Sequence, residues 1–233
     1  MASRTDRPLI LVGSGPGIGR HIACEFALRR FNKVALLARN AGRLAEDQAA
    51  VQAATDGKTE VRTYTVDITN DEEFIATLDK IEKEMGSPEI FYYNAARVAL
   101  SKLLESDAKE MEFDFQINCT SLHTAAKWAI PRLVSLANAD TDARPSLLVT
   151  SSLLPLDPIP DVFALSMAKA AQRNMTQSLA KVYGPKGVHI GMVLVGGRVD
   201  PAHETLSPSN IASRTWGLFE EPKGKQTFEI QVV

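Results

Sequence analysis

Cysteine is scarce in this chain of 233 residues, which contains only Cys24 and Cys119. Neither belongs to a close Cys/His cluster, so we expect neither a disulfide scaffold nor a zinc site. No apolar run reaches the ~18 residues that a membrane-spanning helix needs, and the polar residues 1–8 do not form a signal peptide. The sequence therefore predicts a reduced, soluble, cytoplasmic protein without a membrane partner.

An excess of charge of one sign is also missing. The chain has 26 basic and 28 acidic residues, a net charge of −2, and no basic tail or stripe. Nucleic acid is therefore not an expected partner. Apolar residues make up 45% and charged residues 23%, which is typical of a globular protein. We expect a single domain over residues 1–233 that binds a small molecule and assembles as a homo-oligomer.

Short apolar runs alternate with longer amphipathic stretches along the chain. The runs predict strands at residues 9–12, 34–38, 61–66, 90–93, 147–150, 188–195 and 226–233. The amphipathic stretches predict helices at residues 21–30, 41–54, 71–85, 107–137, 161–183 and 210–219, the fourth being interrupted or kinked near Pro131. This alternation predicts an α/β fold: a Rossmann-type, doubly wound parallel sheet of about seven strands.

A glycine-rich loop follows the first predicted strand and opens the first helix. Gly13 would allow the tight turn, and Gly17 and Gly19 would let the backbone approach a pyrophosphate at the helix N-terminus. Ser14 and Ile18 belong to the same loop. A glycine-rich turn without a ligand is the alternative, but four glycines in seven residues weaken a fold that gains nothing from them. The loop therefore favours a dinucleotide site.

The spacing Gly-x-x-x-Gly-x-Gly resembles the short-chain dehydrogenase/reductase family, and further segments match that family in order. They are the Asp motif at residues 66–69, Tyr-Asn-Ala-Ala at residues 93–96, the helix-borne Asn118, Ser152 at the end of the fifth strand, and Lys169. The resemblance implies a nicotinamide-dependent oxidoreductase. It implies cofactor contacts at Gly13, Ser14, Gly17, Ile18, Gly19, Asp67, Ile68, Asn94, Ala95, Ala96, Lys169 and Val199.

The end of the second strand predicts which nicotinamide cofactor binds. An acidic residue there would repel a 2′-phosphate, whereas Arg39 can hold that phosphate by a charge-assisted hydrogen bond. A solvated surface arginine is the alternative, but the position beside the glycine loop favours NADP(H). Lys127, nine residues after Asn118, is a weaker candidate for a cofactor contact, with a structural or solvated role as its alternative.

The family's catalytic set, which the resemblance gives as Asn, Ser, Tyr and Lys, is incomplete here. Four residues before Lys169 the chain has Leu165 where the family has its proton-donating Tyr, while Asn118, Ser152 and Lys169 are kept. Asp161 precedes Leu165 by four residues, so on a helix it would lie on the same face. It is a candidate acid, and an N-cap of the helix is the alternative role.

Residues 160–163, Pro-Asp-Val-Phe, resemble a segment of fungal short-chain-dehydrogenase-like proteins that also lack the Tyr. Some of these proteins reduce an iminium-type intermediate with NADPH in alkaloid biosynthesis and also shape a cycloaddition. An iminium carbon is already cationic, so hydride transfer to it needs no proton donor. The resemblance thus implies an acceptor in secondary metabolism for which the Tyr is dispensable.

The segment that covers the substrate in the family is nearly absent. Only residues 198–206 separate Gly196-Gly197 from the start of the last helix at residues 207–210. A short segment predicts an open cleft. Three functions stay possible at this stage: an NADPH-dependent reductase of an unusual substrate, a non-redox isomerase or cyclase on the same frame, and a catalytically silent NADP(H)-binding protein.

Overall fold

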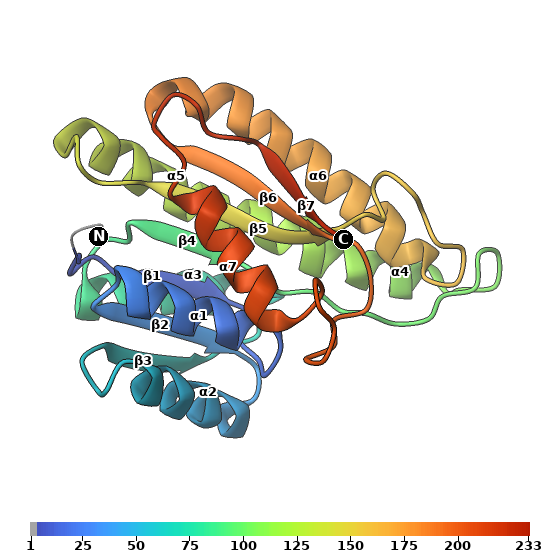
Figure 1. Cartoon of the computed structure of the whole chain (residues 1–233). Coiled ribbons are helices and arrows are strands. Elements are labelled where there is room, and N and C mark those ends of the chain that lie inside the picture. Colours follow the sequence, from blue (N-terminus) through green and yellow to red (C-terminus); the bar gives the residue numbers. More distant parts are fainter. Residues whose placement is uncertain (1–3) are drawn as a thin grey trace.

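Seven strands form one parallel sheet in the order β3-β2-β1-β4-β5-β6-β7 (Figure 1). The structure is a computed structural model that describes residues 4–233, so the first three residues of the polar N-terminus lie outside the described range. The strands are β1 (Leu9–Val12), β2 (Lys33–Ala38), β3 (Glu60–Thr65), β4 (Ile90–Tyr93), β5 (Ser146–Ser152), β6 (His189–Val195) and β7 (Glu229–Val232). The predicted doubly wound sheet of seven strands is confirmed.

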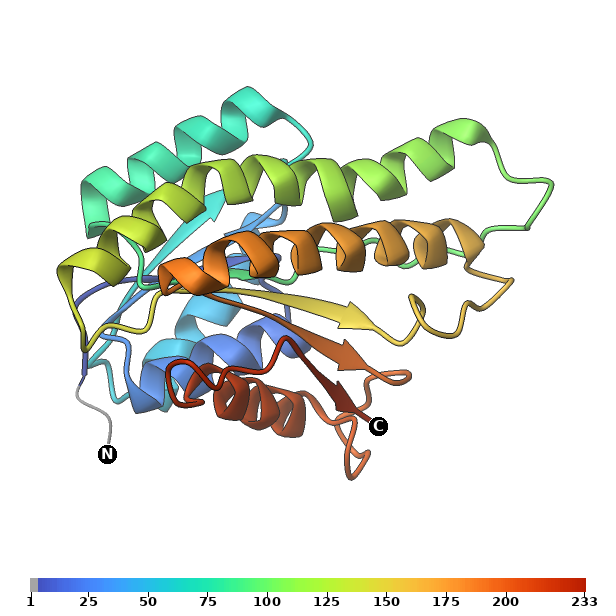
Figure 2. The same ribbon diagram turned by 90° about the horizontal axis from the view of Figure 1, so that it is seen from above.

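Helices cover both faces of the sheet (Figure 2). Helices α1 (Ile18–Arg29), α2 (Ala41–Ala54) and α7 (Pro208–Phe219) contribute to one apolar core, and α3 (Asp71–Met85), α5 (Ser121–Ala139) and α6 (Phe163–Tyr183) to the other. Along β1, Leu9 and Leu11 belong to the first core and Ile10 and Val12 to the second. Both faces of the strand are apolar because both are covered, which explains the uninterrupted apolar run.

The order of the strands places a crevice between β1 and β4. The chain builds β2 and β3 on one side of β1, and α3 then carries it back to β4 on the other side. Parallel sheets bind ligands at such a switch point, outside the carboxyl ends of the strands. Asn94, directly after β4, closes the crevice: its backbone N–H donates to the Val12 carbonyl and its side-chain amide to the Gly13 carbonyl, each at 2.8 Å.

Two predicted helix boundaries differ from the structure. Helix α1 begins at Ile18, three residues earlier than expected. The predicted interruption near Pro131 is wrong, because α5 runs through that proline. Pro131 has no N–H to donate to the carbonyl of Lys127, one turn earlier. Both residues lie on the exposed face of α5, where water can satisfy that carbonyl. The break comes earlier, where α4 (Ala108–Phe115) is joined to α5 by a π turn, η1 (Gln116–Thr120).

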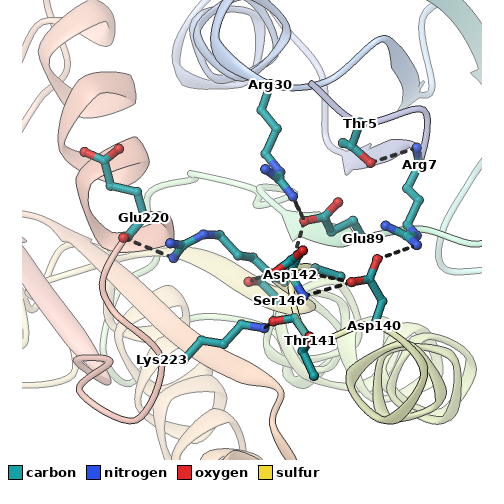
Figure 3. Close-up of polar contacts among 12 residues, drawn as sticks. Thr5, Arg7, Arg30, Glu89, Asp140, Thr141, Asp142, Ser146, Glu220 and Lys223 are labelled. Atoms are coloured by element: carbon teal, nitrogen blue, oxygen red, sulfur yellow. Dashed lines mark hydrogen bonds and ion pairs between the residues drawn. The ribbon is translucent and has the colours of Figure 1, made fainter. Parts of the chain in front are cut away.

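A polar network fixes the end of the sheet opposite the crevice (Figure 3). The buried Glu89 carboxylate accepts hydrogen bonds from the Arg30 guanidinium at 2.7 Å and from the Arg144 backbone N–H at 2.8 Å. The Arg144 guanidinium donates to the carbonyls of Glu220 and Glu221 beyond α7. The network therefore ties together the end of α1, the start of β4, the start of β5 and the end of α7.

The part of the chain that the structure describes has no helix both long and apolar enough to cross a bilayer. Within the same residues, no group of three or more His, Cys, Asp or Glu side chains could hold a metal ion.

Candidate functional site

Two adjoining cavities of about 640 and 620 Å³ lie along the carboxyl ends of the strands and share Gly15, Asn94 and Ala96. Among the residues that the sequence nominates, the first cavity is lined by Gly13, Ser14, Arg39, Asp67, Ile68, Asn94, Ala95 and Ala96. The second is lined by Gly17, Ile18, Gly19, Asn94, Ala96, Ser152, Lys169 and Val199. The cavities together give an elongated site centred on the β1–β4 switch point.

The glycines of the loop have two roles: Gly13 is required by the backbone conformation and its packing, whereas Gly15 and Gly17 border open space that a ligand can occupy. Gly13 has a φ of +88°, and a Cβ there would lie 2.5 Å from the Ala95 nitrogen, so only glycine fits. A Cβ on Gly15 or Gly17 would meet no protein atom within 4 Å. Gly17 is the N-cap of α1 and offers no side chain to its first-turn N–H groups. The open space beside an uncapped helix N-terminus fits a pyrophosphate.

A buried carboxylate fixes the glycine loop from beneath. Asp47 on α2 accepts a 2.6 Å hydrogen bond from the Ser14 hydroxyl and a 2.5 Å hydrogen bond from Arg20 Nε on α1. Its side chain is inaccessible to solvent, and the Arg20 guanidinium balances its charge. Ser14 is thus held in place by α2, and the loop is preorganised before a ligand arrives.

Two arginines line the first cavity, Arg39 just before α2 and Arg43 in its first turn. Arg39 follows β2, and the Asn40 side chain caps α2 by accepting a 3.0 Å hydrogen bond from the Arg43 backbone N–H. Both guanidiniums are exposed, and within residues 4–233 neither has a hydrogen bond or an ion pair. They are available to a polyanionic ligand. Arg43 was not predicted from the sequence, although its place four residues after Arg39, in the first turn of α2, was the available signal.

Asp67 and Ile68, which follow β3, form a wall of this cavity. The Asp67 carboxylate accepts hydrogen bonds from the backbone N–H of Thr69 at 3.0 Å and from its hydroxyl at 2.8 Å. These bonds, with the positive charge of Arg39, lower the pKa of the Asp67 carboxyl. A fixed carboxylate at this wall can accept hydrogen bonds from the amino group of an adenine.

Lys169 lies in the second cavity, with only 4% of its surface exposed. Its ammonium donates to the Thr150 carbonyl at 3.2 Å and to Gln172 Oε1 at 3.0 Å. Burial lowers the pKa of Lys169 to about 8. Asn118 is fully buried on η1 and lines neither cavity. Its side chain donates to the Asp114 carbonyl at 2.8 Å, so Asn118 supports the site from behind.

The wall that precedes Lys169 is apolar. Leu165 lines the second cavity, and 4% of its surface is exposed. The chain has four tyrosines, and none of them lines either cavity. Tyr92 shares a hydrogen bond with the Thr150 hydroxyl, and Tyr93 donates to the Ile117 carbonyl. No phenol of the described residues therefore lines the site.

The structure does not bring Asp161 or Lys127 into the site. Asp161 is exposed, lines neither cavity, and precedes α6, which begins at Phe163. The reason is that this segment forms a turn, closed by the Val162 N–H bonding the Ile159 carbonyl at 3.1 Å, and is joined to Ser101 by a parallel bridge at Val162 before α6 begins. The N-cap role expected of Asp161 is also wrong, because the Ser101 hydroxyl accepts the 3.1 Å hydrogen bond from the Ala164 N–H. Lys127 is exposed on α5, more than two turns from Asn118.

Asp157 and Gln172 are further residues that the sequence analysis missed. Asp157 contributes the single carboxylate to the second cavity among the described residues, and its surface loop has no pattern that would reveal this. Gln172 could have been found, because Lys169, Gln172 and Thr176 form a buried polar stripe on α6 at helical spacing.

The segment between β6 and α7 is short and internally bonded. The His203 ring nitrogen accepts hydrogen bonds from the N–H groups of Thr205 and Leu206, and the Asn210 side chain donates to the Thr205 carbonyl at 2.6 Å. Leu206 is buried against Gly197. Within residues 196–206 only Leu206 is buried and Val199 and Thr205 are half-buried, and the other residues are exposed.

The sequence matches the family described as short chain dehydrogenase over residues 8–208. The chain belongs to this family and is an oxidoreductase of its type. An uncharacterized oxidoreductase of Staphylococcus saprophyticus is 25% identical over 240 residues, which cover 100% of this chain and 99% of that protein.

Two solved structures share the fold. L-sorbose reductase from Gluconobacter frateurii, complexed with NADPH and L-sorbose, aligns with a TM-score of 0.87 at 16% identity, over 100% of this chain and 96% of that one. An NADH-dependent reductase complexed with NAD aligns with a TM-score of 0.84 at 19% identity, over 97% and 94% of the two chains. The same fold thus accepts either nicotinamide cofactor, and side chains must decide between them.

Proposed function

We propose that this protein is an NADP(H)-dependent reductase that delivers hydride to a C=O, C=N or conjugated bond of a small organic molecule without a tyrosine proton donor. The observation that carries the proposal is the second cavity, where Lys169 and Ser152 are present and Leu165 occupies the place of the donor. The best acceptor is one that is already cationic or conjugated, such as an iminium ion in secondary metabolism.

The preference for NADP(H) rests on Arg39 and Arg43. Both line the first cavity, and neither guanidinium has a hydrogen bond or an ion pair within the described residues. A 2′-phosphate is a dianion near neutral pH, and two unpaired guanidiniums bind it by charge-assisted hydrogen bonds. In an NAD-specific site an acidic side chain would stand here instead.

The chain's own residues divide the remaining work. NADPH, when bound, would supply the hydride. The glycine loop and the α1 N-terminus hold the pyrophosphate, and the Lys169 ammonium binds the nicotinamide ribose hydroxyls. The Ser152 hydroxyl, at the mouth of the second cavity, donates a hydrogen bond to the heteroatom of the acceptor. An apolar wall that includes Leu165 and Val162 excludes water from the reacting face.

The experiment is an assay of NADPH oxidation against a matched panel of ketones, enones and cyclic iminium ions. We expect turnover of iminium ions and enones and little turnover of plain ketones, because ketone reduction produces an alkoxide that must be protonated. Ketone reduction at rates equal to iminium reduction would overturn the proposal. Binding of NADPH with no turnover of any acceptor would instead favour a silent NADP(H)-binding protein, and product without NADPH oxidation an isomerase or cyclase.

A cytoplasmic location, a small-molecule substrate and assembly as a homo-oligomer stay predictions. Size-exclusion chromatography with light scattering tests the last of these.

A further inference from the structure

A buried glutamine stands behind the second cavity. Gln172 lies one turn after Lys169 on α6, is 0% exposed, and lines neither cavity. An uncharged amide in this position costs free energy unless both of its ends find partners. They do: Oε1 accepts the 3.0 Å hydrogen bond from the Lys169 ammonium, and Nε2 donates to the Asn118 carbonyl at 2.9 Å.

The chemistry of the two partners fixes the orientation of the amide. An ammonium can only donate and a backbone carbonyl can only accept, so the oxygen of Gln172 must face Lys169 and its nitrogen must face Asn118. Glutamine is the residue that offers an acceptor and a donor at that reach without a charge. Leucine or methionine would remove one hydrogen bond from the Lys169 ammonium and one from the Asn118 carbonyl, and an ionised glutamate would face the Asn118 carbonyl with a second acceptor.

We propose that Gln172 is a positioning residue of the site, which holds the Lys169 ammonium in place and couples it to the π turn that carries Asn118. The π turn η1 places the Asn118 carbonyl against α6 instead of leaving it on the helix surface. π turns are frequent at functional sites for this reason. Gln172 thereby joins Lys169 and Asn118, whose own side chains share no hydrogen bond with each other.

The surroundings of Lys169 explain why a neutral acceptor matters so much. A thiolate at Cys119 on η1 would raise the pKa of the Lys169 ammonium. Burial raises the pKa of the Cys119 thiol to about 11, so it is neutral where Lys169 titrates. Strand β5 has no titratable side chain. The other such groups on the elements packed against α6 are Lys109, Glu110, Glu112 and Asp114 on α4, Lys186 on η2, His189 on β6 and Glu229 on β7. The Glu229 carboxylate pairs with Arg173, and Asp157, which lines the same cavity as Lys169, has no ion pair with that lysine.

No carboxylate therefore holds this ammonium, and its charge depends on two neutral oxygens, those of Thr150 and Gln172. Removing the Gln172 oxygen leaves one. We expect the ammonium then to lose its proton at lower pH and to lose its fixed position. Replacing the amide by a carboxylate should instead raise the pKa of Lys169, because an opposite charge within hydrogen-bond distance favours the charged ammonium.

The test compares Gln172→Met and Gln172→Glu, which keep the length of the side chain. The dissociation constant of NADPH is measured by calorimetry from pH 6.5 to 10. We expect NADPH to bind roughly five- to tenfold more weakly to Gln172→Met at pH 7.5, since one hydrogen bond to a charged group is lost. The pH at which affinity declines should move down in Gln172→Met and up by about one unit or more in Gln172→Glu.

Gln48→Met is the matched control, because Gln48 on α2 also donates to a backbone carbonyl, that of Val61, at 2.7 Å but lines neither cavity. It should change stability without moving the pH profile. Profiles of both Gln172 variants that coincide with that of the unmodified protein would overturn the proposal. If Gln172→Met does not fold, the test rests on Gln172→Glu alone, in which the pH at which NADPH affinity declines should move up.

The affinity measurement rests on the proposed role of Lys169 in binding NADP(H), and a second measurement does not. The pH dependence of urea unfolding reports the titration of Lys169 without any ligand. If the unmodified protein binds no NADPH, the proposed function fails. The role of Gln172 still stands or falls with the unfolding profiles, which should shift in opposite directions in the two variants.

Discussion

Leu165 and Lys169 lie one turn apart on α6 and line the same cavity, so an apolar side chain stands beside the buried ammonium. Because Leu165 borders the cavity, a larger side chain has space to extend into it. We predict that Leu165→Tyr introduces a proton donor beside the ammonium. The expected result is a gain of roughly 10²-fold in the reduction of plain ketones.

The measurement is kcat/KM for a ketone and for an iminium ion with the same carbon skeleton. Only the ketone should benefit, because iminium reduction needs no proton. Leu165→Phe, which has the same ring without the hydroxyl, is the matched control and should give no gain. An equal gain with Phe would show that ring volume, not acid catalysis, is responsible.

The two free guanidiniums predict the cofactor preference. Arg39→Ala and Arg43→Ala should each weaken NADPH binding by about 1–3 kcal/mol, the range for hydrogen bonds to charged groups. NADH binding should change little, because it lacks the 2′-phosphate. Calorimetric titration with both nucleotides checks this. Equal affinity of the unmodified protein for NADH and NADPH would contradict the assignment.

Lys169 predicts a pH-dependent contribution to stability. Its pKa is lowered to about 8 in the folded protein and is 10.5 in the absence of burial, so the unfolded chain binds more protons between these values. Stability from this group therefore rises with pH across that window and is flat below it. Relative to Lys169→Met, the free energy of unfolding should increase by about 2 kcal/mol from pH 8 to pH 10.

Urea titrations of the ligand-free proteins at several pH values measure this difference, in which the titrations of all other groups cancel. A constant difference across the window would mean that the lysine is not desolvated. The same variant should bind NADPH more weakly at pH 7.5, although no tyrosine is present whose pKa the lysine could lower.

The N-terminus of α6 is capped by a residue far away in the sequence, so substituting that residue should destabilise the protein. The Ser101 hydroxyl accepts the hydrogen bond from the Ala164 N–H, so Ser101→Ala should cost about 1 kcal/mol, as for the loss of an N-cap. Asp161→Ala should cost less than about 0.5 kcal/mol, because the exposed Asp161 side chain caps nothing. Urea unfolding of the two variants decides between the residues, and a larger loss for Asp161→Ala would contradict the structure.

Apolar runs covered on both faces predicted the strands well, and the glycine loop located the crevice, because both patterns are local in sequence. The features that sequence reasoning missed depend on contacts between distant segments. Ser101 caps α6 from 63 residues away, which removes Asp161 from the helix face on which its candidacy rested. Pro131 does not break α5 because the carbonyl it leaves without a donor, that of Lys127, lies on the solvent side of the helix. Gln172 reaches Asn118 across 54 residues.

The compact turns between β6 and α7 bear on which step sets the pace of turnover. In enzymes with a long flap, opening of the flap to release product often limits kcat. Here the His203 hydrogen bonds fold a short segment on itself and the Asn210 side chain ties it to the start of α7, so nucleotide exchange has no long flap to wait for. The C–H bond cleavage itself should then be rate-limiting, and NADPH carrying deuterium at the transferred position should slow kcat as much as kcat/KM. An isotope effect seen on kcat/KM alone would place the slow step in release instead.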